Sequence, residues 1–200
     1  MGATGMRATG MGTTLMRTAL RFVLPIALAI GLSFGFSATG RAQGFTLCQS
    51  TFALCTIAPC TPITGKEVAC RCTVHTGYSA SQKPCQSVTA TAAGEQIRSR
   101  YYPVKSYVIC DNARLWAWCL DKPCTISKND PNAATCTCDA VKNLGSYVIV
   151  TSTYRPAACT TGIISSATVQ AITQITDYLK ENEKLLAPFP IKVLSATQPG

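Results

Sequence analysis

Twelve cysteines form two sets of six that recur in the same order, and this pattern restricts the fold more than any other feature of the chain. In each set a Cys-x4-Cys pair with proline before its second cysteine precedes a Cys-x-Cys pair. The first set comprises Cys48, Cys55, Cys60, Cys70, Cys72 and Cys85, and the second comprises Cys110, Cys119, Cys124, Cys136, Cys138 and Cys159. This shared order predicts a tandem repeat of two six-cysteine units.

Residues beside the cysteines recur as well, and they indicate a small, disulfide-rich, β-rich fold. Proline precedes and threonine follows both Cys60 and Cys124. Stretches rich in β-branched and aromatic residues, bounded by turn residues, predict strands at residues 45–48, 69–74, 104–110, 135–139 and 146–154. Turn-forming residues predict loops at residues 59–66 and 127–133, the second around Asn-Asp-Pro-Asn.

The first 42 residues have the features of a cleaved leader. Arg17 and Arg21 precede an uncharged apolar run at residues 22–36, and Gly40 and Ala42 supply the small residues of a cleavage site. This arrangement predicts a secretory signal peptide and a periplasmic or secreted protein. A membrane anchor is the alternative, but the run is shorter than the roughly 20 residues of a spanning helix, so we expect no transmembrane span after cleavage.

Removing the leader lowers the net charge from +9 to +5, which leaves 14 basic and 9 acidic side chains. The densest basic group is Arg98, Arg100 and Lys105, around Tyr101 and Tyr102. Interleaved bases and aromatic rings can bind nucleic acid. An exported protein rarely meets nucleic acid, so we expect no such partner.

The last part of the chain contains no cysteine and has a helical pattern. Ser165 or Ser166 can cap a helix that Pro188 ends. Its apolar stripe comprises Val169, Ile172, Ile175, Leu179 and Leu186. We expect a C-terminal amphipathic α-helix that packs this stripe on both cysteine-rich units.

These patterns predict the following organisation: a leader and signal peptide at 1–42, cysteine-rich unit 1 at 43–88, a linker at 89–103, cysteine-rich unit 2 at 104–162, the amphipathic helix at 163–188 and a tail at 189–200. The linker could instead form a short helical turn. Each unit is too short to bury much apolar area, so cross-links are expected.

We expect all twelve cysteines to form disulfides, three in each unit. Each bond contributes about 2 to 4 kcal/mol, mostly by restricting the unfolded chain. Six cysteines allow fifteen pairings, and the sequence does not choose among them. Side chains two residues apart on a strand share a face, so Cys70 and Cys72 should bond to separate partners, as should Cys136 and Cys138.

Metal or redox chemistry is the alternative use of the Cys-x-Cys pairs. Zinc sites favour two to four intervening residues at each end, which the single residue between Cys70 and Cys72 does not match, and exported cysteines are usually oxidised before they meet metal. All four methionines that could help to bind copper lie in the leader. Arg71, between Cys70 and Cys72, could activate a thiolate, but Thr137 replaces it in the second set. We therefore expect neither a metal nor a cofactor.

The chain offers few residues for catalysis, and we expect no catalytic site. His75 is the single histidine, without a counterpart in the second set, and is expected in a surface loop. Asp111 and Asp121 near Trp116 and Trp118 are expected to be solvated acids.

Trp116 and Trp118 are the candidate binding residues, because alternate residues on a strand place both rings on one face; packing in the core is the alternative. We expect a disulfide-stabilised binding or structural module of the cell envelope whose partner is a protein or a glycan.

Overall fold

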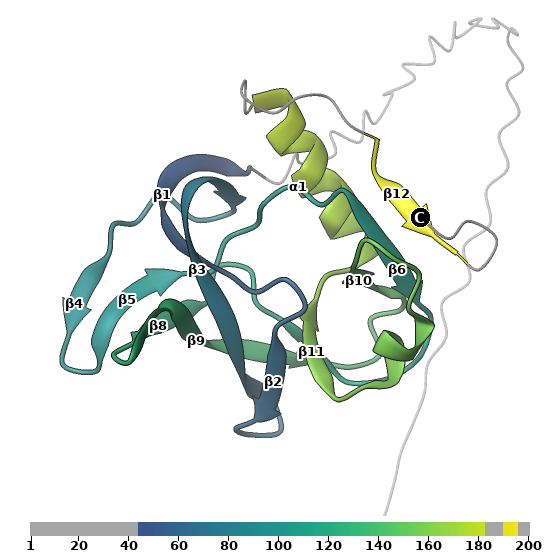
Figure 1. Cartoon of the computed structure of the whole chain (residues 1–200), viewed down its shortest axis with the longest axis horizontal. Helices are drawn as coiled ribbons and strands as arrows, with labels where there is room; N and C mark the ends of the chain where they lie inside the picture. Colours follow the sequence, from purple (N-terminus) through teal and green to yellow (C-terminus); the bar gives the residue numbers. More distant parts are fainter. Residues whose placement is uncertain (1–43, 183–189, 196–200) are drawn as a thin grey trace, which may run out of the picture. The chain divides into compact units, whose positions relative to one another are not determined.

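The structure is a computed structural model that describes residues 44–182 and 190–195. The chain divides into two units, Met1–Gly40 and Arg41–Gly200, and every described residue belongs to the second (Figure 1). Its elements are β1 (Thr46–Leu54), β2 (Pro59–Pro62), β3 (Glu67–Ser81), β4 (Thr89–Thr91), β5 (Gly94–Arg98), β6 (Ser106–Cys110), β7 (Trp116–Trp118), β8 (Pro123–Ser127), β9 (Asp130–Val141), β10 (Tyr147–Val150), the 3-10 helix η1 (Pro156–Thr160), β11 (Ile163–Ser166), α1 (Val169–Asn182) and β12 (Lys192–Leu194). The protein is β-rich, with one α-helix near the C-terminus, as the sequence predicts.

Two long antiparallel strands, β3 and β9, are the centre of a nine-stranded sheet. Cys70 faces Cys136 at the middle of their register. On the edge of β3 that faces away from β9, β3 pairs with β1 and β2. On the edge of β9 that faces away from β3, β9 pairs with β7 and β8. Each central strand therefore pairs with the other central strand on one edge and with two further strands on the opposite edge.

Two further strands close the sheet into rings. Strand β11 pairs with β2 on one side and with β7 on the other, so β3, β2, β11, β7 and β9 form a closed ring. Strand β5 pairs with β8, and a bridge between Ala53 and Ser99 joins the end of β5 to β1. A second ring therefore passes through β9, β8, β5, β1 and β3.

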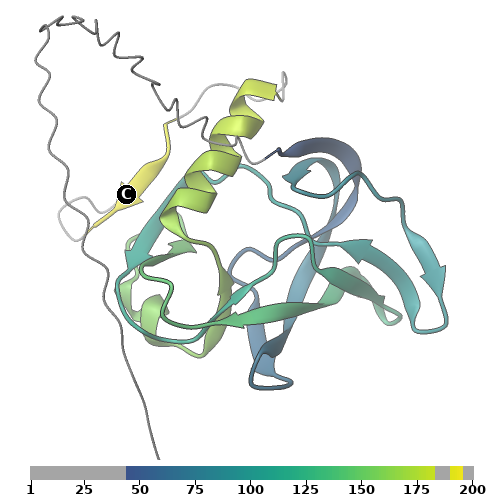
Figure 2. The same ribbon diagram turned by 180° about the vertical axis from the view of Figure 1, so that it is seen from behind.

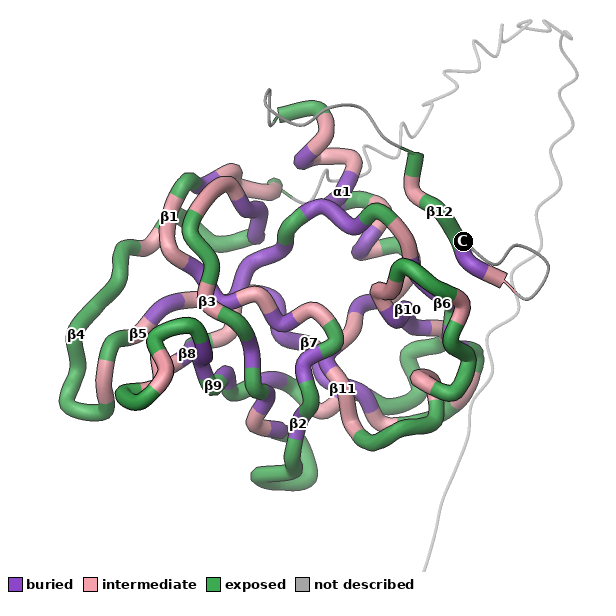
Figure 3. The backbone as a smooth tube through the Cα atoms, in the orientation of Figure 1, coloured by how far each residue is buried: buried purple, intermediate pink, exposed green. Residues whose placement is uncertain are grey.

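The alternation of apolar and polar residues explains why β3 and β9 form strands with one buried face. On β3, Val68, Cys70 and Cys72 are buried whereas Glu67, Arg71 and Thr73 are exposed. On β9, Cys136 and Cys138 are buried whereas Thr135 and Thr137 are exposed. This period of two places every Cys-x-Cys sulfur in the core. By contrast, the short edge strand β4 is exposed throughout (Figure 3).

A smaller sheet contains β10, β6 and β12 in that order. Strands β6 and β10 are antiparallel and correspond to two of the predicted strands, although both are shorter than predicted. Strand β12 pairs in parallel with the outer edge of β6. The last described residues therefore pair with a strand that comes from the middle of the sequence.

Helix α1 covers a second part of the core, at the end of the described unit opposite the β2–β3 turn (Figures 1 and 2). The helix buries Ile172, Ile175 and Leu179, as its apolar stripe predicts. These side chains pack in one cluster with Ala80, from the first half of the chain, and Val148, from the second. The predicted packing of the helix on both halves is thus observed.

The predicted cap of the helix was wrong. Ser165 and Ser166 lie in β11, and the helix begins at Val169 after Thr168, whose Oγ1 accepts a hydrogen bond from Ala171 N at 3.2 Å. Both serines are committed to sheet pairing, which overrides their local tendency to cap. Leu186 and Pro188 lie outside the described residues.

The stretch that we expected to be a linker or a helical turn is a β-hairpin instead. Strand β4 pairs with β5, and β5 is an integral strand of the large sheet. The two predicted loops are also shorter than expected, because β2 begins at Pro59, β8 extends to Ser127 and β9 begins at Asp130. The strands extend into the predicted loops because they pair with segments distant in the sequence, and turn residues within the loops do not predict such pairing.

The predicted leader, residues 1–42, and most of the predicted tail lie outside the described part of the chain. Within residues 44–182 and 190–195, no helix is both long enough and apolar enough to cross a membrane.

Candidate functional site

A row of four cysteines crosses four neighbouring strands at the centre of the large sheet. Cys60 on β2 faces Cys70 on β3, Cys70 faces Cys136 on β9, and Cys136 faces Cys124 on β8. The first and last of these pairs are disulfides, with Cα atoms 4.1 Å and 4.0 Å apart. The bonds therefore link strands that are already hydrogen-bonded neighbours.

The second cysteine of each Cys-x-Cys pair reaches a different partner. Cys72 bonds to Cys55 and Cys138 bonds to Cys119, with Cα separations of 4.5 Å and 4.7 Å. This agrees with the prediction that the two sulfurs of a Cys-x-Cys pair have separate partners. Each bond ties a central strand to the end of the strand or loop beside it.

Two further disulfides, Cys48–Cys85 and Cys110–Cys159, complete the set, so all twelve cysteines are paired. The six bonds form two nested series, in which the first cysteine of a set bonds to the sixth, the second to the fifth and the third to the fourth. Cys85 is exposed and Cys159 is half-buried, whereas the other ten cysteines are buried. The two outer bonds are therefore more accessible than the four inner ones.

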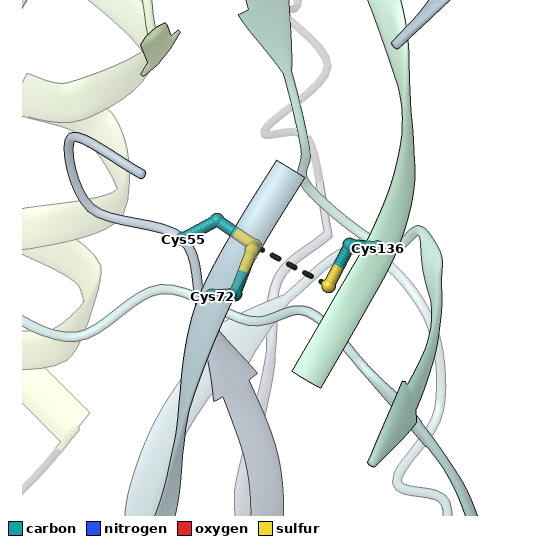
Figure 4. Close-up of side chains that lie close together, drawn as sticks. All are labelled: Cys55, Cys72 and Cys136. Carbon is teal, nitrogen blue, oxygen red and sulfur yellow. Dashed lines mark hydrogen bonds between the residues drawn. A yellow bond between two sulfur atoms is a disulfide. The ribbon is translucent and has the colours of Figure 1, made fainter. Parts of the chain in front are cut away.

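The four inner disulfides lie in one buried cluster. The sulfurs of Cys55, Cys72 and Cys136 lie within 4.8 Å of one another, and Cys55 Sγ is 3.5 Å from Cys136 Sγ (Figure 4). Both sulfurs are bonded in disulfides and carry no proton, so this is a van der Waals contact. Reaction with an external substrate needs access to solvent and a free thiolate, so burial and pairing close this cluster to external reagents.

Trp116 and Trp118 share one face of β7, as predicted, but they do not form an exposed pair. Trp116 is 1% exposed and stacks on Tyr147 with ring centroids 5.8 Å apart. Trp118 is half-buried and meets the ring of Tyr101 edge-on at 6.2 Å. Their packing favours the alternative that both rings contribute to the core.

The acids near the tryptophans and the single histidine also have structural contacts. Asp111 accepts a hydrogen bond from Ser146 Oγ at 3.2 Å, and Asp121 accepts one from Gln82 N at 2.9 Å. His75 lies on β3 rather than in a loop, where it is exposed and its ring stacks on Phe52. These groups do not converge on one another.

The dense basic group does not form a basic surface, because Arg100 is 2% exposed. Its guanidinium donates hydrogen bonds to Ser79 Oγ at 2.9 Å, to Thr46 O at 2.7 Å and to Ser81 Oγ. Burial lowers the pKa of Arg100, and the negative charge of Asp121 opposes this shift. Arg100 therefore ties together backbone segments of β1 and β3.

An exposed aromatic groove lies at Tyr102, and we define it as the Tyr102 groove. It consists of two surface hollows, each of about 330 Å³, that share Tyr102 and Leu54 as lining residues. Tyr102 is 46% exposed, which is unusual here because most other aromatic rings are buried or half-buried. The rest of the lining comprises Phe52, His75, Thr76, Gly77 and Tyr78 in one hollow and Thr56, Pro103, Val104, Lys105, Ser106, Val150, Thr151 and Ser152 in the other.

Hydroxyl groups line this groove and keep hydrogen-bonding capacity. Ser106 Oγ donates to Thr151 O at 2.6 Å, and Thr151 Oγ1 donates to Thr153 O at 3.0 Å. Thr151 Oγ1 also accepts from Thr153 N at 3.3 Å, so it has one lone pair left for a ligand, and Ser106 Oγ can likewise accept from a ligand. Neither hollow has an aspartate or glutamate among the described residues that line it. The groove thus combines an aromatic face with acceptor hydroxyls.

Tyr102 lies among basic residues in the sequence, and its position in a groove was not predicted. The available signal was the Tyr101-Tyr102 doublet, because adjacent side chains of an extended chain point in opposite directions. If one ring is buried, the other must face outward. The sequence does not say which ring is exposed.

Comparison with known proteins found no matching protein-family model, no matching curated protein and no matching solved structure.

Proposed function

We propose that this protein is an exported, disulfide-stabilised binding module of the cell envelope, periplasmic or secreted, that holds a glycan in the Tyr102 groove. The single observation that carries this proposal is the exposed ring of Tyr102 between two hollows of a cross-linked fold. Six disulfides fit an oxidising compartment and supply a rigid support for a site.

The lining of the groove favours a glycan over a protein partner. A sugar ring offers C–H groups that pack on an aromatic face and hydroxyls that donate to oxygen acceptors. Tyr102 supplies the first contact, and Ser106 and Thr151 supply acceptors of the second kind. The combined hollow volume is in the range of small-ligand sites, which are about 300 to 1,000 Å³.

The thiol redox or metal-handling alternative has less support. It would require free thiolates at Cys70, Cys72, Cys136 or Cys138, and all four are bonded and at most 1% exposed.

The experiment is a binding measurement with immobilised oligosaccharides and with purified peptidoglycan. We expect the wild-type protein to bind one of these glycans and Tyr102→Ala to weaken that binding at least about tenfold, which is roughly 1.4 kcal/mol. Leu144→Ala is the matched control, because Leu144 is an exposed apolar side chain outside the groove. Equal binding by Tyr102→Ala, or binding to envelope proteins but to no glycan, would contradict the proposal.

We also propose that the protein is an internal duplication whose two copies exchange their final strands. The two nested disulfide series support this, and so does the symmetric register of β3 and β9 about Cys70 and Cys136. The second residue after Cys55 and after Cys119, Ile57 and Asp121, has a positive φ of 50° and 62° respectively.

Matching hydrogen bonds at Ser99 and Ser165 support the exchange of strands. Ser99, at the end of β5, donates from Oγ to Cys119 O and accepts from Lys122 N at 2.9 Å. Ser165, on β11, donates from Oγ to Cys55 O and accepts from Ala58 N at 2.9 Å. Each serine thus binds the loop of the opposite half.

The copies on this interpretation extend beyond the last cysteine of each set. Ser99 bridges to Ala53 in parallel, and Ser165 pairs in parallel with Ala117 at the corresponding position of β7. Residues 89–103 then belong to the first copy rather than to a linker.

A further inference from the structure

In the buried disulfide cluster, the sulfur of Cys55 lies next to two disulfides formed by cysteines of the second set. Cys55 Sγ is 3.5 Å from Cys136 Sγ, which is bonded to Cys124. The same Cys55 sulfur lies within 4.8 Å of the sulfurs of Cys119 and Cys138, which are bonded to each other. Cys55 therefore lies beside two disulfides in addition to its own. Figure 4 shows its contact with Cys136.

We propose that this cluster is a thiol–disulfide exchange site in which Cys55 is the nucleophile and Cys136 the sulfur attacked. The reaction begins when Cys55 is a free thiol, while the chain is being oxidised and before the Cys55–Cys72 bond has formed. The Cys55 thiolate then attacks Cys136 Sγ, so the Cys55–Cys136 bond forms and the Cys124–Cys136 bond breaks. Cys124 leaves as a thiolate and takes up a proton, and the exchange step itself is redox-neutral.

The geometry favours this particular exchange. The attacking and attacked sulfurs are already in van der Waals contact and need to approach by about 1.5 Å to reach a disulfide bond length of about 2.0 Å. The cluster is closed to solvent, with Cys55 3% and Cys136 0% exposed, so the two sulfurs meet each other rather than an external thiol. The same step in reverse lets Cys124 resolve a Cys55–Cys136 bond formed while the chain is being oxidised.

This exchange concerns the path by which the core reaches its native bonds, and it does not depend on a ligand in the Tyr102 groove. It differs from redox catalysis, because no external substrate enters the cluster. Its product is a bond between the two halves of the chain, in place of bonds that each remain within one half.

The test uses the full chain with Cys72→Ser, which leaves Cys55 without its partner and needs no reductant. After an acid quench that stops exchange, alkylation and peptide mapping locate the free thiol. We expect at least about half of the free thiol at Cys124, together with a peptide pair linked through Cys55 and Cys136. The matched control is Cys70→Ser, whose released Cys60 belongs to neither sulfur group, and there the thiol should stay at Cys60.

A thiol that remains only at Cys55 in a folded Cys72→Ser protein would overturn the proposal. If that variant does not fold, the fully reduced wild-type protein is reoxidised, and samples are quenched with acid at intervals and mapped. A linked Cys55–Cys136 peptide pair supports the exchange. Free thiols at Cys55 and Cys72 without that pair overturn it.

Discussion

Two adjacent tyrosines show how one extended segment serves both the core and the surface. Tyr101 is 8% exposed and its hydroxyl donates to Ser166 O at 3.3 Å, whereas the ring of Tyr102 faces the groove. Successive side chains on extended backbone point to opposite sides, so burying one ring presents the other. A single stretch of chain therefore anchors the core and supplies the candidate ligand contact.

The buried tyrosine predicts a loss of stability in alkali. Burial raises the pKa of Tyr101, and the negative charge of Asp121 raises it further, so the folded state holds the phenol proton more tightly than the unfolded state does. The free energy of unfolding is unaffected by this group below about pH 10 and falls above it, because the unfolded chain loses the proton first.

We expect Tyr101→Phe to lose less stability than the wild-type protein between about pH 9 and pH 11, measured as the urea midpoint at each pH. Tyr102→Phe, which removes a hydroxyl from an exposed ring, should lose as much as the wild-type protein. An equal loss in Tyr101→Phe and the wild-type protein would show that another group causes the alkaline effect.

Strands β5 and β11 hold the two halves together through one serine each. Ser99 and Ser165 are both 2% exposed, and each hydrogen-bonds a carbonyl and an N–H of the loop in the other half. Replacing either serine by alanine leaves these groups only their long hydrogen bond to each other, 3.4 Å from Lys122 N to Cys119 O and 3.5 Å from Ala58 N to Cys55 O, at a cost of about 1 to 3 kcal/mol.

We therefore expect Ser99→Ala and Ser165→Ala to lower the free energy of unfolding by similar amounts in this range, measured by chemical denaturation. Ser87→Ala, at an exposed serine, should change it by less than about 0.5 kcal/mol. A large effect of only one of the two buried serines would argue against the proposed duplication.

The amphipathic helix shows which features of an element can be predicted from its sequence. Ile172, Ile175 and Leu179 recur with helical spacing, and this periodicity predicted both the helix and its buried face. The start of the helix was misplaced because β11 takes Ser165 and Ser166 into the sheet. Local capping preferences are worth about 1 kcal/mol, which nonlocal strand pairing can exceed.

For the molecule as a whole, the disulfides form an accessible outer pair and a buried inner four. Cys85 and Cys159 give solvent access to Cys48–Cys85 and Cys110–Cys159, whereas the inner eight cysteines are at most 9% exposed. A thiolate must reach a sulfur before it can open the bond.

We expect a mild reductant under native conditions to release four thiols, at Cys48, Cys85, Cys110 and Cys159, before any other. Alkylation and mass spectrometry of the intact protein count them, and the untreated protein should have twelve fewer hydrogens than its reduced form. Early release of Cys70 or Cys136 would contradict the buried arrangement, as would a free thiol in the untreated protein.

The candidate site was only partly predictable. The alternation of side chains along β7 correctly predicted that both tryptophan rings share one face. How deeply that face is buried depends on packing against Tyr101 and Tyr147, which are distant in the sequence. The Tyr102 groove is formed by side chains from β1, β3 and the segments before β6 and after β10, so no local motif encodes it.

The sequence by itself determined the local features of the protein: a β-rich, disulfide-bonded chain with a C-terminal amphipathic helix, and separate partners for the two sulfurs of each Cys-x-Cys pair. These follow from periodicity and from the reach of a disulfide bond, which act over a few residues. Only the tertiary structure decided which of the possible cysteine pairings occurs, that β5 and β11 each bridge two strands, and which of two adjacent tyrosines is exposed. These features depend on contacts between segments distant in the chain, where strand pairing and burial outweigh local preference.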